Sequence, residues 1–129
     1  MSEKITVEII SPEKLIIKTN SSEVIIPSYE GEMGILKDHV ALITFLRPGI
    51  IKIIDEKERK FFVEEGTVEF KDNNLLILTS TAREVLDIDK NSLENLIVEA
   101  ERKIYDKKIS DKEKYTLSYK IETLRNINK

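Results

Sequence analysis

Hydrophobic and polar residues alternate with a period of two through the first two thirds of the chain. Residues 5–9 show the pattern most clearly, because Ile5, Val7 and Ile9 fall on one face and polar residues on the other. Further short segments rich in β-branched or aromatic residues follow at 15–18, 24–26, 50–54, 60–63, 67–70 and 75–78. Turn-forming residues such as Pro48 and Gly49 separate these segments. The pattern predicts an antiparallel β-sandwich of about 8–10 short strands.

The period changes to 3.6 after residue 89, which predicts helices. The apolar stripe of the first helix is Leu93, Leu96, Ile97, Ala100 and Ile104. Either Asp89 or Asn91 can cap this helix, and Asn91 with Glu94 resembles a capping box. Ser110 and Glu113 offer a second capping box, and the next stripe is Leu117, Ile121 and Leu124. The chain is therefore predicted to be α+β, with a sandwich over residues 1–88 and an αα-hairpin over residues 89–129.

The predicted hairpin has too narrow an apolar stripe to be stable alone. Burial contributes about 25 cal/mol per Å², and the entropy of ordering two helices offsets most of what two short stripes supply. The hairpin must then lie against the sandwich or against a partner. An element close to balance between two packings is suited to act as a switch.

Charge divides the chain in the same place as hydrophobic periodicity. Residues 1–88 carry 11 Lys and Arg against 16 Asp and Glu, whereas residues 89–129 carry 10 against 8. Acidic residues are interleaved with the basic ones in the tail, so a nucleic-acid-binding arm is disfavoured. The start of the sequence lacks the features of a signal peptide, and apolar runs reach only about four residues, so any membrane association is expected to come through a partner.

The sequence offers little catalytic or metal-binding chemistry. There is no cysteine, and His39 is the only histidine, so neither a thiolate zinc site nor a histidine cluster is expected. Gly31 to Gly34 lacks the Lys-Ser/Thr that a phosphate loop needs. A small hydrolase using His39 and Asp38 is an alternative, but no nucleophile or second base accompanies them. A non-enzymatic interaction protein without a cofactor is the favoured interpretation.

Three of the four glycines, two of the three prolines and the histidine lie within residues 27–50, a stretch that resembles a known family. The resemblance rests on Glu30-Gly31-Glu32-Met33-Gly34-Ile35-Leu36, then Asp38-His39, then Leu46-Arg47-Pro48-Gly49-Ile50. It extends over the rest of residues 1–88 and is looser after residue 90. These motifs resemble those of the ε subunit of F-type ATP synthases. The chain departs from the family pattern where two prolines are replaced by Lys37 and Ala41 and a glycine by Glu65.

The resemblance implies a central-stalk subunit that joins the γ subunit to the ring of c subunits. Such a subunit couples ion-driven rotation of the ring to γ and is itself non-catalytic. The residues that match the segment contacting the c ring are Tyr29, Glu30, Gly31, Glu32, Met33 and Gly34. His39, Leu42 and Thr44 match the stretch that faces γ or the ring. The resemblance also implies a peripheral location on the cytoplasmic face of the bacterial inner membrane.

The helical unit of this family can inhibit ATP hydrolysis by extending towards an acidic segment of the β subunit. The basic residues suited to that contact are Lys107, Lys108, Lys112, Lys114, Lys120 and Arg125. Some relatives also bind ATP in this unit through an Ile/Leu-Asp-x-x-Arg-Ala motif. Here Ile88 and Asp89 match the motif but Ser92 and Leu93 replace its arginine and alanine, so weak or absent ATP binding is expected. A free-standing sandwich adaptor with a helical tail is the alternative function.

Overall fold

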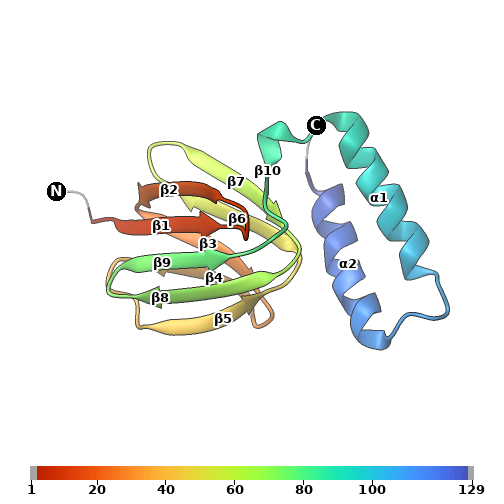
Figure 1. Cartoon of the computed structure of the whole chain (residues 1–129), viewed down its shortest axis with the longest axis horizontal. Helices are drawn as coiled ribbons and strands as arrows, with labels where there is room; N and C mark the ends of the chain where they lie inside the picture. Colours follow the sequence, from red (N-terminus) through yellow and green to blue (C-terminus); the bar gives the residue numbers. More distant parts are fainter. Residues whose placement is uncertain (1–2, 128–129) are drawn as a thin grey trace.

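Ten strands and two α-helices form the part of the chain that the computed structural model describes, residues 3–127 (Figure 1). The strands are β1 (Ile5–Ile10), β2 (Leu15–Ser21), β3 (Glu23–Ser28), β4 (Gly31–Leu36), β5 (Leu42–Leu46), β6 (Gly49–Ile54), β7 (Glu58–Val63), β8 (Gly66–Lys71), β9 (Asn74–Leu78) and β10 (Arg83–Glu84). The 3₁₀ helix η1 (Val85–Asp87) leads to α1 (Lys90–Ile104) and α2 (Asp111–Arg125). The predicted combination of a sandwich followed by a helical hairpin is confirmed.

The strands form two layers that share a corner. One layer has the order β10-β7-β6-β3, with β4 paired to β3, and the other has the order β5-β8-β9-β1-β2. The pairing of Ser28 with Leu46 joins β3 to β5 and so connects the layers. All pairs are antiparallel except β1 with β9, which are parallel. Strands β4 and β5 lie outside the segments that the sequence pattern predicted. In β4, two glycines mask the alternation, whereas β5 has a period-two pattern that was not assigned to a strand.

The core between the layers follows the predicted alternation. Ile5, Val7 and Ile9 are buried, and the residues between them on β1 are half-buried. Strand β7 differs, because Phe61, Phe62 and Val63 are all buried in succession. Phe61 and Val63 belong to the core between the layers, whereas Phe62 belongs to a second cluster on the outer face. Strand β7 therefore has apolar packing on both faces.

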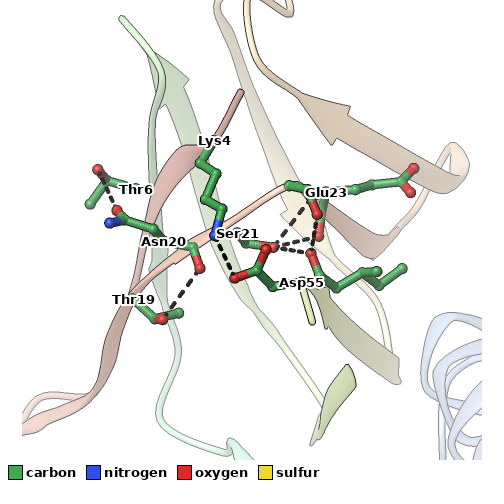
Figure 2. Close-up of polar contacts among 9 residues, drawn as sticks. Lys4, Thr6, Thr19, Asn20, Ser21, Glu23 and Asp55 are labelled. Atoms are coloured by element: carbon green, nitrogen blue, oxygen red, sulfur yellow. Dashed lines mark hydrogen bonds and ion pairs between the residues drawn. The ribbon is translucent and has the colours of Figure 1, made fainter. Parts of the chain in front are cut away.

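A polar corner closes the sandwich where the chain passes from β2 to β3 (Figure 2). The Ser21 Oγ lies 2.6 Å from the carbonyl oxygen of Ile54 and 2.8 Å from that of Glu23. The hydroxyl of Ser22 donates to the same Ile54 oxygen over 2.9 Å. Lys4 forms an ion pair with Asp55 at 2.9 Å beside these contacts. Buried Ser21 thus has its hydroxyl satisfied, as a polar group inside a sandwich requires.

Side chains at both helix starts fix where the helices begin. Asp89 accepts a hydrogen bond from the backbone N–H of Ser92 over 2.7 Å and is the N-cap of α1. Asn91 lies inside α1, so the expectation of a capping box at Asn91 is wrong. The carboxylate of Asp89 already satisfies one of the free N–H groups of the first turn, that of Ser92. The predicted capping box of α2, at Ser110, is present.

The hairpin packs against the outer face of the sandwich, with α2 between α1 and the strands (Figure 1). The buried members of this second cluster are Phe62, Ile88, Leu93 and Leu124. The half-buried side chains around them are Ile50, Val85, Leu96, Ile97 and Ile127. Each helix thus contributes part of its stripe to a cluster that also contains Phe62 of β7. The narrow stripes are completed by the sandwich.

We expect Leu124→Ala to release the hairpin from the sandwich. Leu124 is fully buried, and a buried Leu→Ala change costs about 2–5 kcal/mol. Hydrogen exchange should become faster at the amides of α2 while the amides of β1 and β9 keep their protection. The control is Val98→Ala on the exposed side of α1, which should change neither. Equal acceleration in the strands and the helices would show that the chain unfolds as one unit and would contradict this expectation.

Candidate functional site

An exposed apolar row crosses the outer face of the layer that the hairpin does not cover. Residues paired across neighbouring strands form this row, which consists of Phe45, Thr67, Leu78, Ile10 and Leu15. Phe45 is 61% exposed, Leu78 45% and Leu15 52%, and Ile43 beside the row is 75% exposed. Soluble proteins seldom leave such a continuous set of large apolar side chains open to water. The apolar row is therefore a candidate protein-binding surface.

The two strand residues predicted to face a partner lie on the opposite face of β5. Leu42 packs against the core between the layers, and Thr44 pairs with buried Val68. The side chains that point outward from β5 are Ile43 and Phe45, which the sequence analysis did not single out. A period-two pattern over residues 42–46 contains this signal, since Ile43 and Phe45 fall on one face.

His39 lies in the turn between β4 and β5 and contacts Val40 and Phe70. Its Nδ1 is 2.7 Å from the backbone oxygen of Val40, and its ring meets Phe70 edge to face with the centroids 6.0 Å apart. The Asp38 carboxylate instead accepts from the side-chain amide of Asn73 over 3.2 Å. The structure does not join His39 to Asp38, so the arrangement lacks the base and orienting carboxylate of a hydrolase.

The segment Tyr29 to Gly34 forms the tight turn between β3 and β4 and the start of edge strand β4. Ser28 holds the turn, because its hydroxyl donates to the Gly31 oxygen over 2.8 Å and accepts from the Glu30 N–H over 3.1 Å. Gly31 has φ +119°, a conformation that residues with a Cβ rarely adopt. Tyr29, Glu30 and Glu32 are exposed. The turn therefore presents carboxylates and an aromatic ring from a fixed backbone.

Arg47 connects this turn to the hairpin. Its Nε donates to the Ser28 carbonyl oxygen over 3.0 Å, and its guanidinium carbon lies 4.1 Å from the centre of the Tyr119 ring on α2. The Tyr119 hydroxyl is 2.9 Å from that of Tyr115, and this hydrogen bond raises the pKa of Tyr115 above its ordinary value. A cation over an aromatic face at this distance is attractive.

A cleft of ≈ 790 Å³ lies between α2 and the outer face of β6 and β7. Charged and aromatic residues line it, among them Glu32, Arg47, Lys52, Lys60, Tyr119 and Glu122. Lys52 and Lys60 are directly opposite each other in the sheet. Both signs of charge are mixed in the lining, which does not favour one class of ligand. Within residues 3–127, no cluster of histidine, aspartate and glutamate side chains could hold a metal ion.

The docked hairpin neutralises some of the basic side chains that were predicted to act in inhibition. Lys120 forms an ion pair with Glu64 of the sandwich at 2.7 Å, with the two side chains 15% and 30% exposed. Arg125 pairs with Glu101, which joins α2 to α1. The other predicted residues, Lys107, Lys108, Lys112 and Lys114, are exposed. In this conformation, the predicted basic residues without an ion-pair partner in residues 3–127 lie around the link between the helices, where Asp106, Asp111 and Glu113 are exposed beside them.

A bidentate ion pair anchors the short strand β10 just before the hairpin. The Nε and Nη2 of Arg59 donate to the two carboxylate oxygens of Glu84 over 2.9 and 2.7 Å. This hydrogen bonding lowers the pKa of Glu84 below its ordinary value and raises that of Arg59. Because β10 pairs with β7 over only two residues, the ion pair holds the segment that carries the chain to α1.

The two residues left from the nucleotide motif serve the packing of the hairpin. Ile88 is buried in the cluster beneath the helices, and Asp89 caps α1. Ser92 takes part in that cap through its backbone N–H. No described helix is long and apolar enough to cross a bilayer.

Comparisons with known proteins give one consistent family. The family model described as ATP synthase, Delta/Epsilon chain, beta-sandwich domain matches residues 4–85. The ATP synthase epsilon chain of Pelagibacter ubique is 46% identical over 130 residues, covering 99% of this chain and 100% of the relative. That of Parvibaculum lavamentivorans is 32% identical over 129 residues, covering 98% of this chain and 97% of the relative.

A similar fold occurs in a solved structure. The matching chain belongs to the cryo-EM structure of the Euglena gracilis mitochondrial ATP synthase, OSCP/F1/c-ring in rotational state 1. The TM-score is 0.73 at 22% identity, and the match covers 97% of this chain and 79% of that chain. At this identity the match concerns the fold, including both the sandwich and the helical hairpin.

We expect the ion pair between Arg59 and Glu84 to make stability depend on acid pH. The pKa of Glu84 is lowered in the folded chain, so its contribution is complete above the unfolded pKa and disappears as pH falls through the folded pKa. Arg59 is 47% exposed, which limits the contribution to about 0.2–1 kcal/mol. Urea unfolding should show Glu84→Gln to be less stable than wild type at neutral pH and equal to it at strongly acid pH.

Glu58→Gln is the matched control for that measurement. Glu58 lies beside Arg59 on β7 and is exposed. Its substitution should leave the difference between neutral and acid stability as in wild type. A Glu84→Gln protein with unchanged stability at neutral pH would mean that solvent screens the ion pair completely.

Proposed function

The chain belongs to the ATP synthase epsilon chain family, and on this premise we propose that it is a central-stalk subunit of an F-type ATP synthase. In this role it connects the γ subunit to the ring of c subunits, so that rotation of the ring driven by ion flow turns γ. The subunit transmits torque and is itself non-catalytic. The observation that carries the proposal is the exposed apolar row on a rigid sheet, in a chain that matches the family over nearly its whole length.

The apolar row and Ile43 supply the proposed docking surface for γ. Phe45 and Ile43 project from β5 while the inward side chains of the same strand pack into the core. A rigid strand with exposed aromatic and aliphatic side chains suits a permanent subunit interface. Leu42 and Thr44 then act as supports on the inner face of this surface, and His39 lies in the turn that leads into β5, where its ring contacts Phe70 of the core.

The turn from Tyr29 to Gly34 supplies the proposed contact with the c ring. Glu32 is exposed on β4, and a carboxylate there suits pairing with basic residues on the loops of the ring. The apolar row and this turn belong to different layers of the sandwich. The subunit can therefore bind two neighbours at once, and the close-packed core between the layers transmits force without large deformation.

The location follows from the proposed assembly. The subunit is peripheral and associates with the membrane through its partners. Relatives from bacteria such as Pelagibacter ubique favour the cytoplasmic face of a bacterial inner membrane. The absence of the family arginine at Ser92 favours a hairpin that binds ATP weakly or not at all.

The hairpin is the proposed regulatory unit. In the docked state its apolar stripes face the sandwich, and Lys120 and Arg125 are neutralised by acidic partners. An extended hairpin would separate these two cations from their acidic partners and add them to the four exposed lysines around the helix link. Such a cluster is suited to an acidic segment of the β subunit. Inhibition of ATP hydrolysis would then require the hairpin to leave the sandwich.

We expect Phe45→Asp to weaken binding to γ by roughly tenfold or more, because it places a charge in an apolar interface. The measurement is co-purification of tagged γ with the substituted chain, followed by titration of the purified pair. Val98→Asp on the exposed face of α1 is the matched control and should bind as wild type does. A wild-type chain that purifies without γ and without a membrane fraction would favour the free-standing adaptor instead.

We expect replacement of Lys107, Lys108, Lys112 and Lys114 by alanine to raise the ATPase rate of the assembled enzyme. The reason is that the extended hairpin would lose most of its attraction for acidic residues of the β subunit. Lys57→Ala, an exposed lysine on the sandwich, is the control and should leave the rate unchanged. Deletion of residues 90–129 should have at least the effect of the four substitutions. An unchanged rate after that deletion, at every ratio of ATP to ADP, would exclude an inhibitory hairpin.

A further inference from the structure

Arg47 lies at the base of the turn that the proposed function assigns to the c ring. It follows the last residue of β5, and its backbone N–H donates to the Pro27 oxygen over 3.0 Å. Its Nε donates to the next carbonyl oxygen along β3, that of Ser28, over 3.0 Å. One residue therefore binds two successive carbonyl groups just before the turn begins. The turn itself is also held by the two hydrogen bonds of the Ser28 hydroxyl, to Gly31 and from Glu30, and by the Tyr29 N–H to Phe45 oxygen bond of 3.4 Å.

The same guanidinium is covered by the hairpin. Its carbon lies 4.1 Å from the centre of the Tyr119 ring, and Tyr119 is held in turn by Tyr115 one helical turn earlier. Glu32 of the β3–β4 segment lines the same cleft as Tyr119. An ion pair between Lys120 and Glu64 also joins the hairpin to the sandwich. Arg47 thus contacts both the base of the turn and the hairpin.

We propose that Arg47 couples docking of the hairpin to the order of the segment Tyr29 to Gly34. With Tyr119 in place, the planar guanidinium is restricted to the orientation in which Nε meets the Ser28 oxygen. When the hairpin leaves, this restriction is lost, and the hydrogen bond that fixes the base of the turn is populated less. Release of the hairpin therefore loosens the turn. The consequence for the c ring rests on the proposed function.

Linkage makes the coupling act in both directions. If docking orders the turn, a partner that binds the ordered turn must favour docking by the same factor. A cation–aromatic contact at a partly exposed site corresponds to about a two- to fivefold change in an equilibrium constant. A rotor bound firmly through the turn would then hold its hairpin docked somewhat more often than a free subunit does. Extension of the hairpin, which the proposed inhibition requires, would accordingly be less favourable in the assembled rotor than in the isolated chain.

The test is hydrogen exchange of the isolated full chain, with no c ring or γ present. Tyr119→Leu removes the aromatic face and keeps an apolar side chain on α2. It should accelerate exchange at the amides of Tyr29 and Glu30 by about two- to fivefold. Tyr119→Phe is the matched control, because it keeps the ring and loses only the hydroxyl, and it should leave these amides near their wild-type rates.

Repeating the Tyr119→Leu substitution in an Arg47→Lys protein separates coupling through Arg47 from a general increase in the exchange rates of the whole chain. In Arg47→Lys, whose ammonium cannot hold a carbonyl and a ring in the same planar geometry, the turn should exchange faster already. Adding Tyr119→Leu there should accelerate the amides of α2 but not those of Tyr29 and Glu30. An unchanged turn in Tyr119→Leu would overturn the proposal. So would an effect of Tyr119→Leu on the turn that persists in full with Lys at position 47.

This test remains separate from the proposed function. If Phe45→Asp fails to weaken binding to γ while the exchange results are as expected, the function is wrong and the coupling stands. If the subunit binds γ and the c ring but the turn is insensitive to Tyr119, the coupling is wrong and the function stands. If the proposed function and the coupling are both correct, adding detergent-purified c ring should slow hydrogen exchange at the amides of α2 in the wild type but not in Arg47→Lys. Equal slowing in both proteins would exclude Arg47 as the link.

Discussion

The fold depends on the burial of Phe62 beneath the hairpin. Strand β7 carries Phe61 towards the core between the layers and Phe62 towards the outer face, so this strand needs apolar cover on both sides. A sandwich alone would leave Phe62 in water, and a hairpin alone would have two stripes too narrow to balance the entropy of ordering its helices. Each unit completes the other. The cluster around Leu124 consequently contributes both to the stability of the sandwich and to the docking of the hairpin, which is the step that the proposed regulation would reverse.

The two layers of the sandwich differ in what covers them, and this difference organises the proposed function. The layer with β6 and β7 is covered within the same chain, by the hairpin. The layer with β5, β8 and β9 has the apolar row, whose Phe45 and Leu78 remain exposed. The hairpin, which is proposed to leave the sandwich, and γ, which is proposed to stay bound, therefore occupy different layers. The core between the layers keeps the two surfaces in fixed relative positions.

The spacing of apolar residues predicted most helices and strands, because this spacing matches the period with which side chains repeat on one face of each element. The alternation in residues 5–9 and the stripe containing Leu93 follow from which side chains must be buried. The parallel pairing of β1 with β9 joins strands distant in sequence, so no turn motif between them could reveal it. Strand β4 was missed because its backbone is held by pairing with β3, which overrides the turn preference of its glycines. The contact of Arg47 with Tyr119 forms only when the hairpin docks, and no sequence motif links the two residues. It could therefore not be predicted from the sequence.

The relative size of the contacts decides what controls the hairpin. Partly exposed ion pairs such as Lys120 with Glu64 contribute about 0.2–1 kcal/mol each, whereas each fully buried leucine contributes about 2–5 kcal/mol. Salt or pH alone would therefore shift the hairpin only slightly, because the apolar cluster holds most of the docking free energy. Extension becomes favourable only when a neighbour offers apolar surface to the stripes of α1 and α2. The acidic partner of the lysines would then select the direction of extension, while apolar contacts would determine whether it occurs.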